Sequence, residues 1–268
     1  MLQDHNRLPS FADMCNQMST TLNRYSSHNL MDIANLSLMN RIDSKFLLPI
    51  DSILHVLEAC KTCYSLLKID GVSVFQYDNI YFDTKDLIFY NNHHNRKLNR
   101  HKVRHRHYED VGSSYLEVKF KNNKGRTIKK RQISQRDEKI ALSSSFEFLK
   151  NNGITWTDSL IPAQKIGYQR ISFANEVQKE RLTLDLNISF ANILEKTPSD
   201  NKFTLTKFYI AELKQEKIDR ESPFFRLMRE MNIRSQGFSK YCMGHALTNK
   251  NIKSNRFKSN LIKINTGA

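Results

Sequence analysis

The sequence predicts an α+β protein built on an antiparallel β-barrel of about eight strands that forms a tunnel, with helices bracing its outside. Apolar and basic residues alternate with a period of two along consecutive segments between residues 100 and 133, which is typical of strands. Turn residues at Gly112-Ser113 and at 122–125 join these segments as hairpins. Strands and helices do not alternate regularly along the chain, which argues against a parallel α/β sheet.

The individual elements follow in order along the chain. A first strand begins at Arg41 and is stopped by Pro49, and Asp51 then caps a helix whose apolar residues recur at helical spacing. Further along, Ser222 caps a helix with Pro223 in its first turn. Besides the three strands between 100 and 133, we expect strands at 41–49, 73–84, 164–174, 180–191 and 203–215, a short helix within 83–94, and bracing helices at 51–65, 136–150 and 222–232.

Two segments flank the expected domain, which spans residues 36–245. Residues 1–35 are polar and weakly periodic, which indicates a short helix or an arm, and residues 246–268 are basic and poor in apolar residues, which indicates a disordered tail. No apolar run approaches the roughly 20 residues of a membrane helix, and the first residues lack the pattern of a signal peptide. We therefore expect a cytoplasmic protein.

The four cysteines fit a reducing compartment. Cys60 and Cys63 form a C-x-x-C pair inside an apolar helical pattern, and the sequence offers no second pair to complete a zinc site. Both are therefore interpreted as buried thiols.

The charge balance implies a polyanionic partner. The chain has 42 Lys and Arg residues against 27 Asp and Glu residues, a net charge of +15. Nucleic acid, an anionic membrane and a phosphate-rich small molecule all fit such a balance. None of the glycines opens a G-x-x-x-x-G-K-[ST] pattern, which excludes a P-loop enzyme.

Basic residues gather on one face of the three consecutive strands. That face carries Lys102, Arg104, Arg106, Glu117, Lys119, Lys121, Thr127, Lys129 and Arg131, and later strands add Tyr168, Arg170, Arg181, Asp185 and Glu212 to polar faces. In a closed barrel these cations would repel one another, and a polyanion threaded through the tunnel would relieve that repulsion. The carboxylates among them, Glu117, Asp185 and Glu212, are candidates to hold a divalent metal on phosphate oxygens.

Eight segments resemble, in the same order, the catalytic domain of the vacuolar transporter chaperone (VTC) family. These are polyphosphate polymerases among the triphosphate tunnel metalloenzymes of the CYTH-like superfamily. The segments are "RIDSKF", "YDNIYFDTKDLIFY", "KVRHRHY", "YLEVKFKNNKGRTIKKR", "KIGYQRISF", "RLTLDLNISF", "IAELKQE" and "FSKYCMG", within residues 36–245. The wider superfamily opens with E-x-E-x-K, where this chain has Arg41, Asp43 and Lys45.

The resemblance implies a tunnel that binds ATP and polyphosphate or pyrophosphate, with Mn²⁺ or Mg²⁺ as cofactor. It implies that Glu212 holds the metal, and that Arg104, Arg106, Lys119 and Arg170 act with it in catalysis. The implied phosphate-binding residues are Lys45, Arg104, Arg106, Lys119, Lys129, Arg131, Tyr168, Arg170, Arg181, Ser239 and Lys240. A basic residue usual after the "FY" helix is spread here over His93, His94 and Arg96.

The function expected on this basis is transfer of the γ-phosphate of ATP to a growing polyphosphate chain, a product that a membrane-protein partner could receive. Alternatives are a non-catalytic module for polyphosphate or inositol phosphates, and a triphosphatase of the same superfamily. Nucleic-acid binding would call for exposed aromatic residues between the basic ones, whereas Val, Leu and Ile alternate with them here. His101, His105 and His107 fall at alternate positions of one strand, with Val103 between the first two, which indicates packing or solvent exposure rather than a zinc site.

Overall fold

The computed structural model describes residues 11–33, 41–136, 145–155, 157–194 and 202–267. Their contacts divide the chain into two compact units. Unit 1 comprises Met1–Ser73, Ile171–Leu184 and Ile210–Gln236, and unit 2 comprises Val74–Arg170, Asp185–Tyr209 and Gly237–Ala268. The strands β8 (Ile161–Asn175), β9 (Glu180–Asn192) and β11 (Phe208–Gln215) contribute residues to both.

The described strands belong to one sheet whose main path is β2-β11-β9-β8-β4-β5-β6-β7. Besides those above, the strands are β1 Ser27–His28, β2 Ile42–Pro49, β3 Ser65–Leu67, β4 Val74–Asp83, β5 Arg100–Tyr108, β6 Ser113–Lys121, β7 Thr127–Ile133 and β10 Lys202–Leu205. The pairs β4–β5, β5–β6, β6–β7, β9–β10 and β3–β8 are antiparallel, and β1–β3 is parallel. The α+β class with a large antiparallel sheet is thereby confirmed. The sheet does not close into the predicted barrel within the described residues, where β2 and β7 are the two ends of its path.

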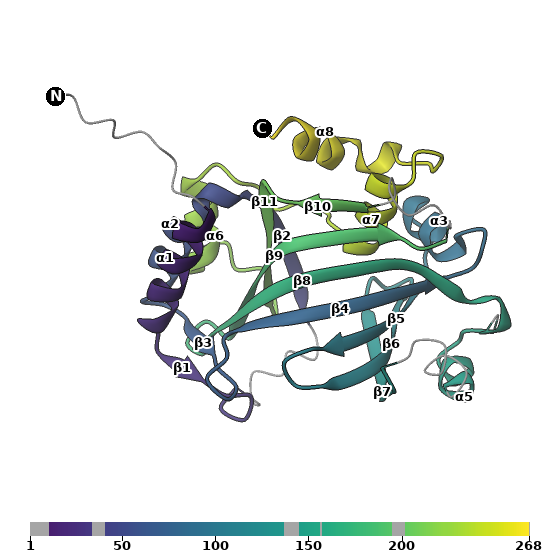
Figure 1. Ribbon diagram of the computed structural model, residues 1–268, viewed down its shortest axis with the longest axis horizontal. Coiled ribbons are helices and arrows are strands. Elements are labelled where there is room, and N and C mark those ends of the chain that lie inside the picture. Colours follow the sequence, from purple (N-terminus) through teal and green to yellow (C-terminus); the bar gives the residue numbers. More distant parts are fainter. Residues whose placement is uncertain (1–10, 34–40, 137–144, 156, 195–201, 268) are drawn as a thin grey trace. The chain divides into compact units, whose positions relative to one another are not determined.

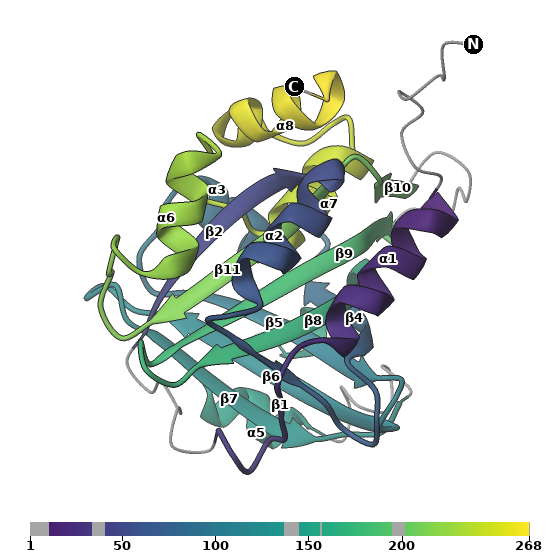
Figure 2. The same ribbon diagram turned by 90° about the vertical axis from the view of Figure 1, so that its left-hand side faces the viewer.

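Unit 1 packs three helices around its part of the sheet. They are α1 Phe11–Asn23, α2 Ile53–Cys60 and α6 Pro223–Glu230, and α2 lies beside both of the others (Figure 2). The ring of Phe46 on β2 meets that of Phe224 on α6 edge-on, with centroids 5.4 Å apart. In the same unit Glu180 is buried and accepts hydrogen bonds from the Tyr64 hydroxyl and from Gln215.

Unit 2 contains the ladder β4-β5-β6-β7, whose strands follow one another in sequence and in space (Figure 1). The N–H of Gly112 donates to the carbonyl of Tyr108, and the N–H of Asn122 donates to that of Arg126, so both predicted hairpins are confirmed. Gly112 has φ +64°, a conformation that glycine adopts without strain. The helices of this unit are α3 Ile88–His94, α5 Phe146–Asn151, α7 Lys240–Thr248 and α8 Lys258–Thr266.

The helix predicted at 51–65 is shorter in the structure. A 3-10 turn, η2 Ile50–Ser52, precedes α2. At the C-terminus of α2, the N–H groups of Cys63 and Tyr64 both donate to the carbonyl of Cys60. The next residues enter β3, which pairs with β1 and β8, so strand pairing takes over from the helical pattern. Cys60 is a buried thiol as predicted, but Cys63 is exposed because it lies beyond the helix.

The strand predicted at 203–215 is two strands, β10 and β11, which are separated by Thr206 and Lys207. The helix predicted at 222–232 is confirmed as α6, whereas most of the one predicted at 136–150 lies outside the described residues and α5 is its described end.

The prediction of a disordered tail at 246–268 is wrong for the described residues. A 3-10 turn, η4 Asn255–Phe257, leads into α8. The guanidinium of Arg256 donates to the carbonyls of His93 and His94 at the C-terminus of α3, and Phe257 is buried against Tyr90 and His94. These contacts place a cation of the tail at the C-terminal carbonyls of α3, where positive charge is favourable, and so fix the tail against that helix.

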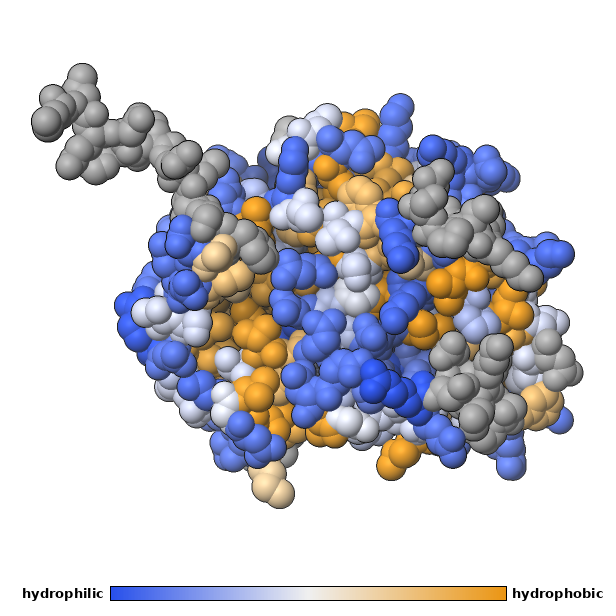
Figure 3. All heavy atoms as spheres, viewed as in Figure 1, coloured by the Kyte–Doolittle hydropathy of each residue, from blue (hydrophilic) through white to orange (hydrophobic). Residues whose placement is uncertain are grey.

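The face shown in Figure 3 is mainly hydrophilic, with separate apolar patches. Among the helices of the described residues, none is long and apolar enough to cross a membrane.

Candidate functional site

Cross-strand register places the basic residues of β5, β6 and β7 on one face of unit 2. Read across the three strands, the rows are Arg104–Glu117–Arg131, Lys102–Lys119–Lys129 and Arg100–Lys121–Thr127. Residues directly opposite each other in a ladder point to the same face of the sheet. The alternate row pairs Val103 with Val118, both buried. The predicted segregation of basic and apolar residues is therefore confirmed for these strands.

Glu117 lies at the centre of this face and is shared by two cations. Arg104 Nε donates to its carboxylate at 2.6 Å, and Lys129 Nζ lies 2.5 Å from its other oxygen. The Glu117 side chain is only 2% exposed. Burial raises the pKa of Glu117, but the charges of Arg104, Arg106 and Lys129 outweigh burial and hold that pKa well below its usual range.

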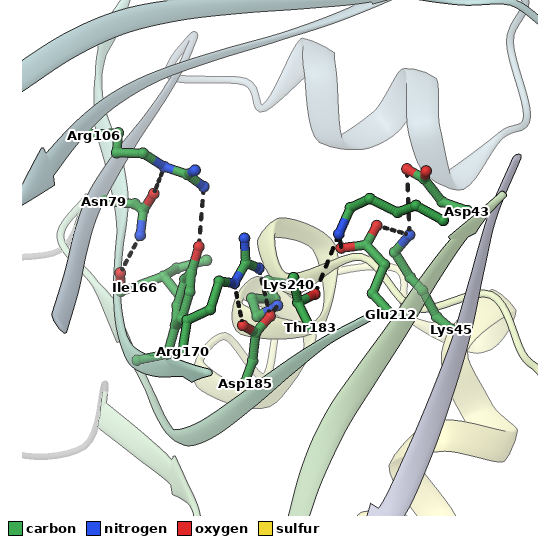
Figure 4. A network of polar contacts seen from close by, with 12 residues as sticks. Asp43, Lys45, Asn79, Arg106, Ile166, Arg170, Thr183, Asp185, Glu212 and Lys240 are labelled. Atoms are coloured by element: carbon green, nitrogen blue, oxygen red, sulfur yellow. Dashed lines mark hydrogen bonds and ion pairs between the residues drawn. The ribbon is translucent and has the colours of Figure 1, made fainter. Parts of the chain in front are cut away.

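Arg106 is the buried cation of this face whose hydrogen-bond partners are all neutral. Its residue is 5% exposed, Nε donates to Asn79 Oδ1 at 3.0 Å, and Nη2 donates to the Tyr168 hydroxyl at 3.0 Å. Nη1 reaches the Tyr108 hydroxyl at 3.5 Å. Among the described residues no carboxylate lies within ion-pair distance of its guanidinium. Figure 4 shows the hydrogen bond from the Arg106 guanidinium to Asn79.

A second shared carboxylate, Asp185 on β9, is fully buried. Arg170 on β8 donates to it through Nε at 2.6 Å and through Nη2 at 2.8 Å, and Lys240 at the start of α7 donates to one of the same oxygens (Figure 4). Burial raises the pKa of Asp185, but the charges of Arg170 and Lys240 overcome it and keep that pKa well below its usual range. The bidentate arginine contact fixes the plane of the Arg170 guanidinium.

Several of these cations also make cation–π contacts with tyrosine rings. The Tyr77 ring stacks on that of Tyr168, with centroids 5.1 Å apart. The guanidinium carbons of Arg106 and Arg170 lie 5.0 and 5.1 Å from the centre of the Tyr77 ring, and Lys240 Nζ lies 4.7 Å from that of Tyr168. Cation–π contacts orient a cation without cancelling its charge.

The start of α7 adjoins the lysine row of β5. Ser239, the N-cap of α7, accepts a hydrogen bond from the N–H of Cys242 and another, at 2.8 Å, from Lys102 Nζ. The predicted residues Ser239 and Lys240 thus both contact the charged groups of unit 2.

Unit 1 carries a separate charged cluster around Glu212 on β11. Lys45 on β2 donates to Glu212 Oε1 at 2.6 Å, and Lys214 Nζ lies 3.6 Å from Oε2 and 3.3 Å from the Thr183 hydroxyl. Asp43 Oδ2 lies 4.0 Å from the same Lys45 nitrogen (Figure 4).

Of the three carboxylates predicted to hold a metal, Glu212 is the most accessible. All three contact two cations, but the side chains of Glu117 and Asp185 are at most 2% exposed, whereas the Glu212 side chain is 14% exposed. Within the described residues no three His, Cys, Asp or Glu side chains group as a metal site. One carboxylate completed by substrate oxygens is nevertheless a common way to bind Mg²⁺, and Glu212 can supply that one ligand.

A family model for the VTC domain matches residues 40–249 of this sequence. The chain belongs to the VTC domain family. No curated protein matches it. Among solved structures, a candidate adenylate cyclase from Bacillus halodurans is similar at 16% identity and TM-score 0.49, covering 82% of this chain and 99% of that one. A candidate adenylyl cyclase from Hippeastrum, reported with a dominant triphosphatase activity, is 14% identical at TM-score 0.46, covering 77% and 95%.

Three further residues predicted to bind phosphate are Lys119, Arg131 and Arg181. Lys119 and Arg131 share the basic face but are exposed, with the Arg131 guanidinium 4.7 Å from the Tyr115 ring centre. Arg181 belongs to unit 1 and donates to the carbonyl of Ile33 at 2.9 Å.

The three candidates for the basic residue after α3, His93, His94 and Arg96, differ in their surroundings. Burial, then the charges of Lys102 and Arg100, lowers the pKa of His93 to about 2, so its ring is neutral near cations of the basic face. His94 bonds Asn255 at the start of η4, and Arg96 is exposed.

The sequence analysis missed the residues of β4 that contact the cations. Tyr77, Asn79 and Tyr81 lie opposite Tyr108, Arg106 and Arg104 in the ladder. They alternate along a segment that was already predicted as a strand, so the same period of two was the signal that would have found them.

Proposed function

We propose that this chain is a polyphosphate polymerase, which transfers the γ-phosphate of ATP to a growing polyphosphate chain. The observation that carries the proposal is Arg106, a nearly buried guanidinium whose described partners are all neutral. A buried cation that makes no ion pair of its own is costly, and an anionic ligand lowers that cost. Arginine presents its N–H groups in a fork that matches the oxygens of phosphate.

The charge balance around Arg106 supports a ligand with several negative charges. Two carboxylates, Glu117 and Asp185, are shared by cations on both sides, which leaves a surplus of positive charge. The cations of this linked group are Arg104, Arg106, Lys129, Arg170 and Lys240. A linear triphosphate carries charge on every phosphate, so it matches such a surface better than a single carboxylate does.

The proposed reaction needs no nucleophile from the protein. A terminal oxygen of the bound chain attacks the γ-phosphorus of ATP, a new P–O–P bond forms, and the bond from the γ-phosphorus to the β–γ bridging oxygen breaks, so that ADP leaves with the electron pair. The transition state is loose and spreads its charge over the transferred oxygens. Fixed guanidinium and ammonium groups align the two phosphates and stabilise that charge.

Glu212 is the residue we propose to hold the divalent ion. The resemblance to the triphosphate tunnel metalloenzymes implies such an ion, and a bound Mn²⁺ or Mg²⁺ would neutralise charge on phosphate oxygens. Lys45 and Lys214 contact the Glu212 carboxylate and would hold it in place.

The tyrosines of unit 2 favour phosphate over nucleic acid as the ligand. Tyr168 is 3% exposed and Tyr81 is 8% exposed, and both rings lie against cations. Rings buried in this way are not available as platforms on which bases stack.

Incubation of the purified chain with ATP and Mn²⁺ tests the proposal. Gel staining should reveal long-chain polyphosphate, accompanied by one ADP for each phosphate incorporated. Release of free phosphate without polymer would make the chain a triphosphatase, and binding of polyphosphate without turnover would make it a binding module. Either result would overturn the polymerase proposal.

Glu212→Gln separates the metal's role from phosphate binding. The substitution should abolish polymer synthesis while tripolyphosphate still binds, because it removes a metal ligand but no cation. Polymer synthesis at the parental rate would show that Glu212 is not the metal ligand.

A further inference from the structure

Asn79 is a buried amide whose two ends both make hydrogen bonds. It lies on β4 directly opposite Arg106 and is 1% exposed. Its Nδ2 donates to the carbonyl of Ile166 on β8 at 3.1 Å, and its Oδ1 accepts from Arg106 Nε at 3.0 Å (Figure 4).

These two partners leave one orientation for the amide. A backbone carbonyl only accepts hydrogen bonds, so the Nδ2 group has to face Ile166. A guanidinium only donates, so Oδ1 has to face Arg106. The Ile166 carbonyl therefore selects an uncharged acceptor, an amide rather than a carboxylate, at the position beside Arg106.

A neutral residue at this position differs from the rest of the cluster. Arg104 and Arg170 are each bonded to a buried carboxylate, Glu117 and Asp185 respectively, which offsets their charge. Arg106 receives the same fixed geometry from Asn79 without that offset. The hydrogen bonds within the described residues use three of its five N–H groups, so two remain for a ligand.

We infer that Asn79 is a positioning residue, which fixes the Arg106 guanidinium through a neutral acceptor so that its full charge acts on the phosphate chain. The inference rests on the proposed binding of phosphate by this cluster. It assigns Asn79 an effect that operates through Arg106 and requires no contact between Asn79 and the ligand.

Asn79→Asp tests the inference because it changes the charge and almost nothing of the shape. The carboxylate would pair with Arg106, and we expect the affinity for tripolyphosphate, measured by calorimetry, to fall at least about tenfold. Asn79→Ala removes both hydrogen bonds but adds no charge, so its affinity should fall less. A merely structural role predicts the reverse order, and that order would overturn the inference.

Asn91→Asp is the matched control for the added charge. Asn91 lies on α3, and its amide donates to the carbonyl of Asp86, which precedes that helix, so this variant changes the net charge equally without touching Arg106 or Asn79. Its tripolyphosphate affinity should stay within about twofold of that of the parent chain, since exposed charges are screened. A loss equal to that of Asn79→Asp would mean that net charge, not Arg106, sets the affinity.

A double-mutant cycle decides the matter even if Asn79→Asp does not fold. Asn79→Ala should weaken tripolyphosphate binding in the parent chain and have no further effect in a chain that already carries Arg106→Ala. Fully additive effects would overturn the inference. If the parent chain itself binds no tripolyphosphate, the proposed function fails instead, so the two failures are distinguishable.

Discussion

The side chains of the basic face differ in how their charge is balanced. Glu117 forms ion pairs with Arg104 and Lys129. Asp185 forms ion pairs with Arg170 and Lys240. Arg106 has only neutral partners among the described residues. Carboxylates therefore hold the other cations in place, and the Arg106 guanidinium, which makes no ion pair among the described residues, keeps its charge for a ligand.

Glu117→Gln should destabilise the chain by about 3 kcal/mol at neutral pH, because it leaves two cations without their carboxylate. The pKa of Glu117 is lowered in the folded state, so its contribution is present above the ordinary glutamate pKa of about 4 and is lost as the pH falls below that value. In urea unfolding at several pH values, the difference in the free energy of unfolding between the parent chain and Glu117→Gln should become smaller below about pH 4.

Glu221→Gln is the control for that experiment, since Glu221 forms an exposed ion pair with Arg229. It should leave the free energy of unfolding unchanged at every pH. A gap for Glu117→Gln that stayed constant down to strong acid would contradict the assignment of a buried, ionised Glu117.

Lys129 makes the affinity for phosphate depend on pH. Burial, then the charge of Arg104, lowers the pKa of Lys129 to about 8, although Glu117 opposes the shift. The free protein loses this proton as the pH rises through that value, so the advantage of the parent chain over Lys129→Gln in tripolyphosphate affinity should be full near pH 7 and should decline above about pH 8. Calorimetry across that range checks it, and a ratio of affinities independent of pH would contradict it.

The pairing of each cation with a carboxylate or with neutral partners could not be predicted from the sequence. The period of two placed Arg104, Arg106 and Glu117 on one face correctly, because alternation along a strand is a local property. Which cation each carboxylate serves depends on contacts such as Asp185 with Lys240, which are 55 residues apart. The neutral partners of Arg106 depend likewise on strand order, which the local pattern does not contain.

At the scale of elements, Asp83 links β4, α3 and α7. Its carboxylate accepts hydrogen bonds from the N–H groups of Thr84, Phe89 and Tyr90, and also from the Tyr241 hydroxyl. It thus caps the first turn of α3 from a distance, while Leu87, the formal N-cap, makes no side-chain cap bond. The link holds α7, which begins with Lys240, against the end of β4.

Asp83→Asn should lower the free energy of unfolding by about 2 kcal/mol, because one carboxylate oxygen that accepts hydrogen bonds becomes an amide that donates them. Urea unfolding measures the loss, and hydrogen exchange at the amides of Phe89 and Tyr90 should speed up as α3 frays. Asp86→Asn, at an exposed position before α3, makes the same charge change and should have little effect. Equal losses for both variants would contradict the capping role.

The elements themselves were predicted well where one pattern dominates. The strands β5, β6 and β7 and the helix α6 follow their periodicity closely. The end of α2 and the order of the tail were not predicted, because β3 pairing and the contacts of Arg256 with α3 are interactions between distant parts of the chain.

At the scale of the whole molecule, the net charge of +15 is not spread evenly over the chain. The basic rows of β5, β6 and β7 concentrate positive charge on one face of unit 2, and their opposite face is apolar at Val103 and Val118. The fold class followed from this segregation and from the hairpin turns, and the VTC family from the order of its motifs.

The most direct test of the account is the affinity of the purified chain for tripolyphosphate, measured by calorimetry with and without Arg106→Ala. The parent chain should bind, and the variant should bind at least about tenfold more weakly, because a charge-assisted contact to phosphate is lost. Arg106→Lys should also bind more weakly, since an ammonium cannot reproduce the fork. Equal affinity of the parent chain and Arg106→Ala would contradict the central claim that this guanidinium holds the phosphate chain.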